Sequence, residues 1–324
     1  MDKPFYLEFL ETLSARYQLP DPSRTRLWAM QTGFKGQEDF EAVVQEILPR
    51  GWRILHDLNF DHSIGKIQID ALLVSPHGIY HFEVKNLVAE CEYRDGEFYN
   101  LAKGYKYQNY FAQMKRQNEL LMPILESLGV DVPLVSRLVF INEEDTVVFH
   151  DNMQDYYLKR WQIKPFLKRV AQQQARSTHY RPLNVDQVTL ALIDKSVAEF
   201  AQDTYEEQVF VQDARRGIIC RYCQASIKIS EINRFAIECS RCGGCEAKER
   251  AILRTICEIG LLHYDQALNS TMVCEFIGVE GLERSARRKL LEFFKRSEQH
   301  KLKNYINPVA SIDKAFPRVR FKHD

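Results

Sequence analysis

The sequence lacks the features that mark membrane, secreted and fibrous proteins. No apolar run approaches the roughly 18 residues that a membrane span needs. The first ten residues include Asp2 and Glu8 and lack the basic and apolar stretches of a signal peptide. Internal repeats and low-complexity tracts are absent, and the composition is close to the globular average, which excludes fibrous and wholly disordered classes. We therefore expect a soluble, cytoplasmic protein without a membrane partner.

The chain also lacks an excess of charge of either sign. Its 44 lysine and arginine residues balance 44 aspartate and glutamate residues. A chain without net charge is a poor candidate for coating nucleic acid non-specifically, although it can still carry a local basic face. The length of 324 residues suggests about two or three folded units of roughly 100–200 residues each.

The composition changes along the chain and divides it into parts. Residues 1–200 alternate amphipathic helical patterns with short apolar runs, which favours an α/β layer architecture. Residues 201–217 are polar and are predicted to be a linker. Residues 218–248 hold a cysteine cluster, residues 249–304 are predicted to form an all-α module, and residues 305–324 are predicted to be an irregular tail.

Local patterns predict the individual elements. Helices are expected at residues 40–48, 107–128, 158–175, 185–200, 247–262, 270–277 and 280–296. Strands are expected at residues 52–55, 67–74, 79–85, 137–141 and 146–149, with short strands at 225–232 and 234–237.

The predicted hairpin that turns at residues 75–78 carries three charged residues in an apolar context. Side chains alternate between the two faces of a strand, so Glu83 and Lys85 share a face. If residues 75 and 78 pair across a two-residue loop, Asp70 lies directly opposite Glu83. A three-residue loop would shift the register by one and send Asp70 to the other face. The sequence alone leaves this register open.

Two carboxylates that converge in this way would repel each other unless a cation lay between them, and hard Mg²⁺ prefers such oxygen ligands. The bound ion would polarise a phosphodiester and activate a water molecule, and a nearby lysine would orient that water or stabilise the developing charge. The alternative is a solvated strand face, on which cross-strand ion pairs contribute roughly a few tenths of a kcal/mol each.

Three short segments surround these charges: QID at residues 68–70, VSPHGI at 74–79 and FEVKN at 82–86. Together they closely resemble the central block of the nuclease-related domain family, NERD. The resemblance covers about residues 33–150 and implies a restriction-endonuclease-like fold, a mixed sheet flanked by helices with a D…(D/E)-x-K centre.

Two flanking segments extend the resemblance. Glu41 stands at the spacing of the glutamate on the family's first helix, although Phe40 precedes it where the family usually has glycine. The segment GQE at residues 36–38 is a nearby alternative, so Glu38 competes with Glu41. Downstream, NYFAQ, ending at Gln113, is similar to the family's Asn-Pro-x-x-Gln, with tyrosine replacing the proline.

The resemblance implies a role for each matching residue. Asp70 and Glu83 would ligate Mg²⁺ or Mn²⁺, and Lys85 would assist the attacking water. Glu41 would hold a metal-bound water or the metal itself, and Gln113 would position a phosphate or water. The implied function is Mg²⁺-dependent hydrolysis of DNA. The alternative is a non-catalytic adaptor that keeps the fold and binds nucleic acid or protein; the five filled family positions favour catalysis.

The cysteines are clustered, which is typical of a metal site in a reducing compartment. Cys220 and Cys223 form one C-x2-C pair, and fifteen residues separate them from a second pair, Cys239 and Cys242. Two such pairs complete the tetrahedral S4 shell of a structural Zn²⁺ site, which indicates a zinc ribbon that depends on metal for folding. Cys245 is an alternative to Cys242.

The last two predicted helices, at residues 270–277 and 280–296, flank a glycine-containing turn and resemble a helix-turn-helix. Basic residues on the outer face of the second helix would contact DNA phosphates. The alternative is a small helical bundle that packs or binds a protein partner, with its charges solvated. The candidate DNA contacts are Arg284, Arg287, Arg288 and Lys289.

Overall fold

The computed structural model describes residues 3–62, 65–144, 146–176, 181–197, 205–279, 281–296 and 304–307. The chain forms two compact units. Unit 1 comprises Met1–Asp2 and Trp28–Phe200, and unit 2 comprises Lys3–Leu27 and Ala201–Asp324. Among the described helices, none combines the length and the apolar character that a membrane crossing requires.

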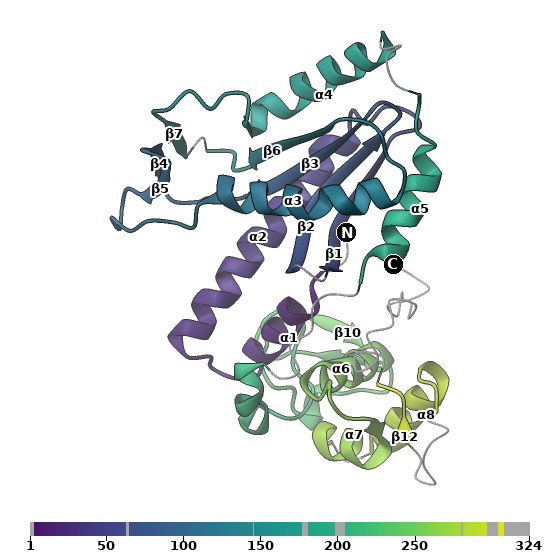
Figure 1. Ribbon diagram of the computed structural model, residues 1–324. Helices are drawn as coiled ribbons and strands as arrows, with labels where there is room; N and C mark the ends of the chain where they lie inside the picture. The colour runs from purple at the N-terminus through teal and green to yellow at the C-terminus, as the bar shows by residue number, and fades with distance from the viewer. Residues whose placement is uncertain are drawn as a thin grey trace. The chain divides into compact units, whose positions relative to one another are not determined.

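Unit 1 contains a mixed five-stranded sheet (Figure 1). The strand order is β1-β2-β3-β6-β8; the β1–β2 and β2–β3 pairs are antiparallel, and the β3–β6 and β6–β8 pairs are parallel. The mixed α/β architecture predicted from the sequence is thus confirmed. The strands are β1 (Arg53–His62), β2 (Gly65–Ser75), β3 (Gly78–Lys85), β6 (Leu134–Phe140) and β8 (Tyr157–Lys159).

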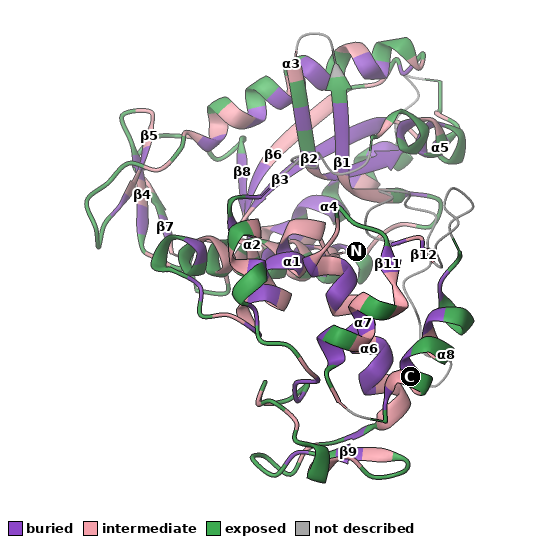
Figure 2. Ribbon diagram, turned by 90° about the horizontal axis from the view of Figure 1, so that it is seen from below, coloured by how far each residue is buried: buried purple, intermediate pink, exposed green. Residues whose placement is uncertain are grey.

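Strand β3 lies at the centre of this sheet and is buried along almost its whole length (Figure 2). Seven of its eight residues are buried, and Lys85 at its end is half-buried. One face of the strand is apolar and carries Tyr80, Phe82 and Val84, whereas the other face carries the buried polar residues His81 and Glu83. A buried charged side chain needs hydrogen-bonding or ionic partners, and Glu83 is the buried acidic residue of this strand.

Helices cover both faces of the sheet. Helix α4 (Arg160–Ala175) and the later part of α2 (Asp21–Gln45) pack on one face, where Phe82 contacts Phe40 of α2 and Phe166 of α4 at ring-centroid distances of 5.2 and 6.3 Å.

On the other face, Leu121 of α3 (Tyr110–Ser127) and Leu192 of α5 (Val185–Lys195) share a core with Leu72 of β2. The side chains of β2 and β3 that point to this second face therefore meet α3.

A small second sheet was predicted only in part, because the sequence predicted one of its strands, the one at residues 146–149. It joins β4 (Cys91–Arg94), β5 (Glu97–Asn100) and β7 (Val147–Phe149) in the order β5-β4-β7. Its hairpin turns at Asp95 and Gly96, whose φ angles of 51° and 78° fit the left-handed conformation that tight hairpin turns use. An aromatic cluster that includes Phe98 forms the core of this part.

Unit 2 is built from two pieces that are far apart in the sequence. Its first piece contains α1 (Phe5–Ser14), which contacts α6 (Lys248–Leu262) and the 3-10 helix η1 (Glu206–Asp213) of the second piece. The Tyr6 ring stacks on Tyr205 at 4.1 Å between centroids. The remaining elements are η2 (Ile229–Glu231), β9 (Ala236–Glu238), β10 (Cys245–Ala247), β11 (Leu268–Asn269), α7 (Ser270–Ile277), α8 (Glu283–Phe293) and β12 (Asn304–Tyr305).

A buried arginine joins the two pieces of unit 2. The Arg16 side chain is fully buried; it forms an ion pair with Glu258 of α6 and donates Nη1 hydrogen bonds to the carbonyls of Arg215 (2.8 Å) and Gly217 (2.9 Å). Arg254 extends the network, because its Nη1 contacts Glu258 at 2.6 Å. A buried charge with this many partners is satisfied, and loss of Arg16 would leave the two carbonyls without their donor.

The structure differs from the sequence predictions in several places. The strand expected at residues 225–232 is wrong: Ser226 forms one isolated bridge, and the chain then enters η2, where the Glu231 carboxylate accepts a hydrogen bond from the backbone N–H of Lys228 at 2.5 Å. The helix expected at residues 185–200 ends at Lys195, and residues 198–200 lie outside the described part.

The domain boundaries stay a prediction. Part of the segment expected to be a linker is the 3-10 helix η1, in which Glu207 and Val211 are buried. The structure also groups residues 3–27 with unit 2, whereas the sequence analysis assigned them to the nuclease-like part. Of the expected tail, residues 308–324 lie outside the described residues.

Candidate active site and cysteine centre

The β2–β3 hairpin has the register that brings Asp70 and Glu83 to opposite positions. Ser75 pairs with Gly78, and continuing this register places Asp70 opposite Glu83. The ladder itself ends one pair earlier, so the backbone N–H of Val84, which points toward β2, lacks a strand partner. The Asp70 carboxylate accepts this hydrogen bond through Oδ2 at 2.8 Å. The Asp70 side chain is thus fixed by a backbone N–H that becomes available where the pairing of β2 with β3 ends.

Glu83 is the buried centre of the site. Its side chain is 1% exposed, and three donors surround its carboxylate. Oε1 accepts from Lys85 Nζ and from Gln113 Nε2, both at 2.6 Å, and Oε2 accepts from Gln117 Nε2 at 2.7 Å. These contacts supply the pairing that a buried carboxylate requires.

Helix α3 brings the two glutamines to Glu83. Asn109 caps the helix by accepting the backbone N–H of Ala112 at 3.0 Å, and the i,i+4 spacing puts Gln113 and Gln117 on one face. Tyr110, which replaces the expected proline, lies under the Lys85 ammonium at 4.9 Å from the ring centroid. Gln117 was not among the residues predicted for the site, because the i,i+4 spacing from Gln113 does not by itself distinguish a site residue from a solvated one.

Helix α2 contributes Gln37, which the sequence analysis did not select as a site residue. Gln37 Nε2 donates to Asp70 Oδ1 at 2.9 Å. Glu41 and Glu38 were the two candidates for the acidic site residue of this helix. Glu41 Oε1 lies 3.7 Å from Nε2 of His56 on β1, and Glu38 is exposed. Gln37, the residue that follows Gly36, therefore contacts Asp70.

The electrostatics of the site favour binding of a cation. Burial, followed by the negative charge of Glu83, raises the pKa of Asp70 to about 7, although Lys85, the Val84 N–H and Gln37 oppose this shift. A carboxylate held beside another carboxylate keeps a high pKa until a cation neutralises the pair.

The oxygen atoms of Asp70 and Glu83 could ligate one hard cation. A carboxylate offers about four lone-pair directions. Asp70 uses two of them and Glu83 uses three in the hydrogen bonds described above. The remaining oxygen lone pairs would supply part of the oxygen shell that Mg²⁺ prefers, and water or substrate would complete it.

The comparison with known families agrees with this geometry. Residues 32–141 match the family described as NERD, nuclease-related domain. The chain carries a nuclease-related domain. This domain contains Asp70, Glu83 and Lys85, together with Gln37 of α2 and Gln113 of α3. No curated protein and no solved structure matches the chain.

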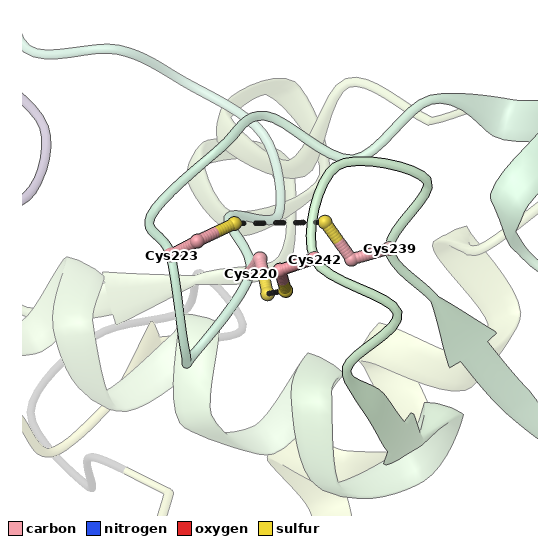
Figure 3. A group of neighbouring side chains, drawn as sticks. All are labelled: Cys220, Cys223, Cys239 and Cys242. Atoms are coloured by element: carbon pink, nitrogen blue, oxygen red, sulfur yellow. Dashed lines mark hydrogen bonds between the residues drawn. The ribbon is translucent and has the colours of Figure 1, made fainter.

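The four predicted zinc ligands come together in unit 2, outside the nuclease-related domain (Figure 3). All four Sγ atoms lie within 4.8 Å of one another, with Cys220 and Cys242 at 3.6 Å and Cys223 and Cys239 at 3.7 Å. Sulfurs bound tetrahedrally to one zinc ion at about 2.3 Å lie about 3.8 Å apart. The cluster can therefore hold one Zn²⁺, and it contains Cys242 where Cys245 was the alternative.

Each cysteine pair sits in a turn of the same construction. The residues that follow the pairs, Gln224 and Gly243, have φ angles of 58° and 71°. Their N–H groups donate to the carbonyls of Cys220 at 2.9 Å and Cys239 at 2.8 Å. Glutamine rarely adopts a positive φ. The hydrogen bond to the Cys220 carbonyl and the surrounding turn therefore hold Gln224 in this conformation, against its own backbone preference.

The C-terminal helices α7 and α8 flank a left-handed residue, Gly278, with φ 57°. Of the four candidate DNA contacts, two are paired within unit 2: Arg288 Nη2 lies 2.7 Å and Lys289 Nζ lies 3.2 Å from the Glu249 carboxylate of α6. Arg284 and Arg287 are exposed.

Proposed function

We propose that the nuclease-related domain hydrolyses DNA phosphodiester bonds with Mg²⁺ or Mn²⁺. One observation carries the proposal: Asp70, Glu83 and Lys85 converge at the end of the β2–β3 hairpin, and the first two are held by hydrogen bonds with lone pairs to spare. This is the donor set that a D…E-x-K phosphodiesterase uses.

Asp70 and Glu83 would hold the cation, which would polarise the scissile phosphate and make a bound water acidic. The Lys85 ammonium orients the attacking water and stabilises the negative charge that develops on the phosphate oxygens. Gln113 sets the direction of Lys85, since its Oε1 lies 3.3 Å from Nζ while its Nε2 holds Glu83. Glu41 stays a candidate for holding a metal-bound water.

Unit 2 would provide DNA affinity. The exposed Arg284 and Arg287 of α8 suit contacts with phosphates, which would make binding salt-dependent without reading sequence. The four-cysteine cluster is a closed S4 site, so its zinc would be structural. A cytoplasmic location belongs to the same proposal, because thiolates stay reduced there.

Cleavage of supercoiled, linear and single-stranded DNA tests the proposal, with RNA as a further substrate. We expect cleavage with Mg²⁺, and loss of at least about 100-fold in rate in Lys85→Ala, because a charge-stabilising donor is removed. Lys115→Ala is the matched control, since Lys115 is an exposed lysine of α3, the helix that covers the site.

The Lys85→Ala change leaves the buried Glu83 without its cation, so folding must be checked and a second variant is needed. Asp70→Asn keeps the shape of the side chain and should abolish cleavage in a folded protein. DNA binding without cleavage, unchanged in both variants, would instead support a non-catalytic adaptor that binds nucleic acid.

A further inference from the structure

We propose that Gln37 is the third member of the metal-binding site and that it keeps this site to two carboxylates and one cation. The inference rests on the proposed function. Its starting point is the hydrogen bond from Gln37 Nε2 to Asp70 Oδ1, at 2.9 Å. It differs from the sequence-based expectation that an acidic residue of the same helix, Glu41 or Glu38, fills this position.

Close packing fixes residue 37 beside Asp70. A Cβ atom at Gly36 would lie 2.6 Å from Asn86 Cβ and 3.1 Å from Ile141 Cγ2, so α2 approaches the end of β3 as closely as only glycine permits. Asn86 also holds α2 directly, because its Nδ2 donates to the Thr32 carbonyl at 2.9 Å. Asn86 immediately follows Lys85, so the contact that positions α2 lies one residue from the site.

The groups that donate hydrogen bonds to the two carboxylates are neutral except for Lys85. In the described part of the chain, the hydrogen-bond donors to Asp70 and Glu83 are the Val84 N–H, Lys85 and three glutamines. The glutamines are Gln37, Gln113 and Gln117.

An amide at position 37 has two effects that a carboxylate would not have. Its NH₂ group donates to Asp70 and so orients that side chain, which an ionised glutamate cannot do. It also adds no negative charge, so the site offers two carboxylates for a divalent ion. Hard cations bind more tightly as the number of charged oxygen ligands rises, so a glutamate here would strengthen the site.

Direct measurement of Mn²⁺ binding tests this inference without relying on catalysis. Free Mn²⁺ is followed by electron paramagnetic resonance during titration of the full chain, purified without chelator so that the cysteine site stays loaded. We expect one Mn²⁺ per chain in the wild type. Gln37→Glu, which preserves side-chain shape, should lower the Kd at least tenfold. Gln37→Leu, which removes the donor to Asp70, should raise the Kd several-fold.

A variant on the same helix serves as the control. Glu38→Gln changes an exposed neighbour and should leave the Kd within about twofold, whereas Glu41→Gln changes the rival candidate and is measured for comparison. The inference is overturned if Glu41→Gln weakens binding while both Gln37 variants leave it unchanged.

Asp70→Asn separates this test from the proposed function. If Asp70→Asn abolishes Mn²⁺ binding but the Gln37 variants have no effect, the cation site stands and the role of Gln37 is wrong. If the wild type binds no Mn²⁺ at the site, or Asp70→Asn changes nothing, the proposed metal-dependent activity fails first and the inference fails with it.

Discussion

Without divalent cations, Asp70 should make the nuclease-related domain less stable as the pH rises. Its pKa moves from 3.8 to about 7 in the folded protein, because it is buried beside Glu83. Between these two values the folded state binds more protons than the unfolded state, so the free energy of unfolding falls as pH increases through this window. Above pH 7 the whole penalty is present.

The size of the penalty follows from the shift. A change from 3.8 to about 7 corresponds to about 4 kcal/mol. Part of the Asp70 surface stays accessible, so solvent screening reduces this upper bound, and we expect about 1–3 kcal/mol. Asp70→Asn should therefore be more stable than the wild type by about this amount at pH 8, and the difference should shrink toward pH 5. The Val84 N–H can still donate to the asparagine oxygen.

Urea unfolding followed by tryptophan fluorescence measures this effect in unit 1 alone. The three tryptophans, Trp28, Trp52 and Trp161, all belong to unit 1. The buffer should be free of Mg²⁺ but contain no strong chelator, so that zinc stays on the cysteines. Asp194→Asn, a change on the exposed surface of α5, is the matched control and should show no pH-dependent difference.

Addition of Mg²⁺ should cancel or reverse the difference in stability between the wild type and Asp70→Asn. A ligand at 100 times its Kd stabilises the folded state by about 2.7 kcal/mol, and only the wild type keeps both carboxylates. If the wild type and Asp70→Asn show the same pH dependence without Mg²⁺, Asp70 is not buried beside a second charge and the site geometry is wrong.

Three further predictions concern the remaining structure. Cys223→Ser should reduce zinc to well below one per chain in elemental analysis and expose residues 218–248 to protease, while tryptophan fluorescence stays native; full zinc occupancy would disprove the ligand assignment. Gly36→Ala should destabilise unit 1 by about 1–3 kcal/mol in urea unfolding, because the new Cβ meets Asn86 at 2.6 Å. Gly33→Ala, with nothing within 4 Å, should be neutral or stabilising, and equal losses in both would contradict the close approach. Arg16→Ala should cost unit 2 about 1–3 kcal/mol by circular dichroism, since the carbonyls of Arg215 and Gly217 lose their donor while Glu258 keeps Arg254; no measurable loss would show that the network is solvated.

The sequence was most informative where the chemistry is local. The hairpin places Asp70, Glu83 and Lys85 within sixteen residues of one another, so strand alternation and turn length reduced the problem to one open register. The spacing of the cysteines likewise defines two turns, and only the choice between Cys242 and Cys245 was left for the structure.

The residues that were missed depend on contacts between distant segments. Gln37 and Gln117 reach the site from separate helices, and a polar residue on a helix has no pattern that distinguishes a site member from a solvated side chain. The burial of Glu83 had the same effect: its 1% exposure depends on packing against α3, so the sequence did not reveal that Lys85 is the cationic partner of a buried carboxylate.

The two-piece construction of unit 2 affects how the chain folds during synthesis. Helix α1 leaves the ribosome first, but its buried partners in α6 follow more than 200 residues later. At about 5–20 residues per second, its apolar residues wait roughly 10–50 s for their core. Unit 1 becomes complete within that interval. Leu7, Phe9 and Leu10, which are almost wholly buried in the folded protein, are then the segment that a chaperone would protect. A fragment that begins after residue 200 would lack this helix altogether.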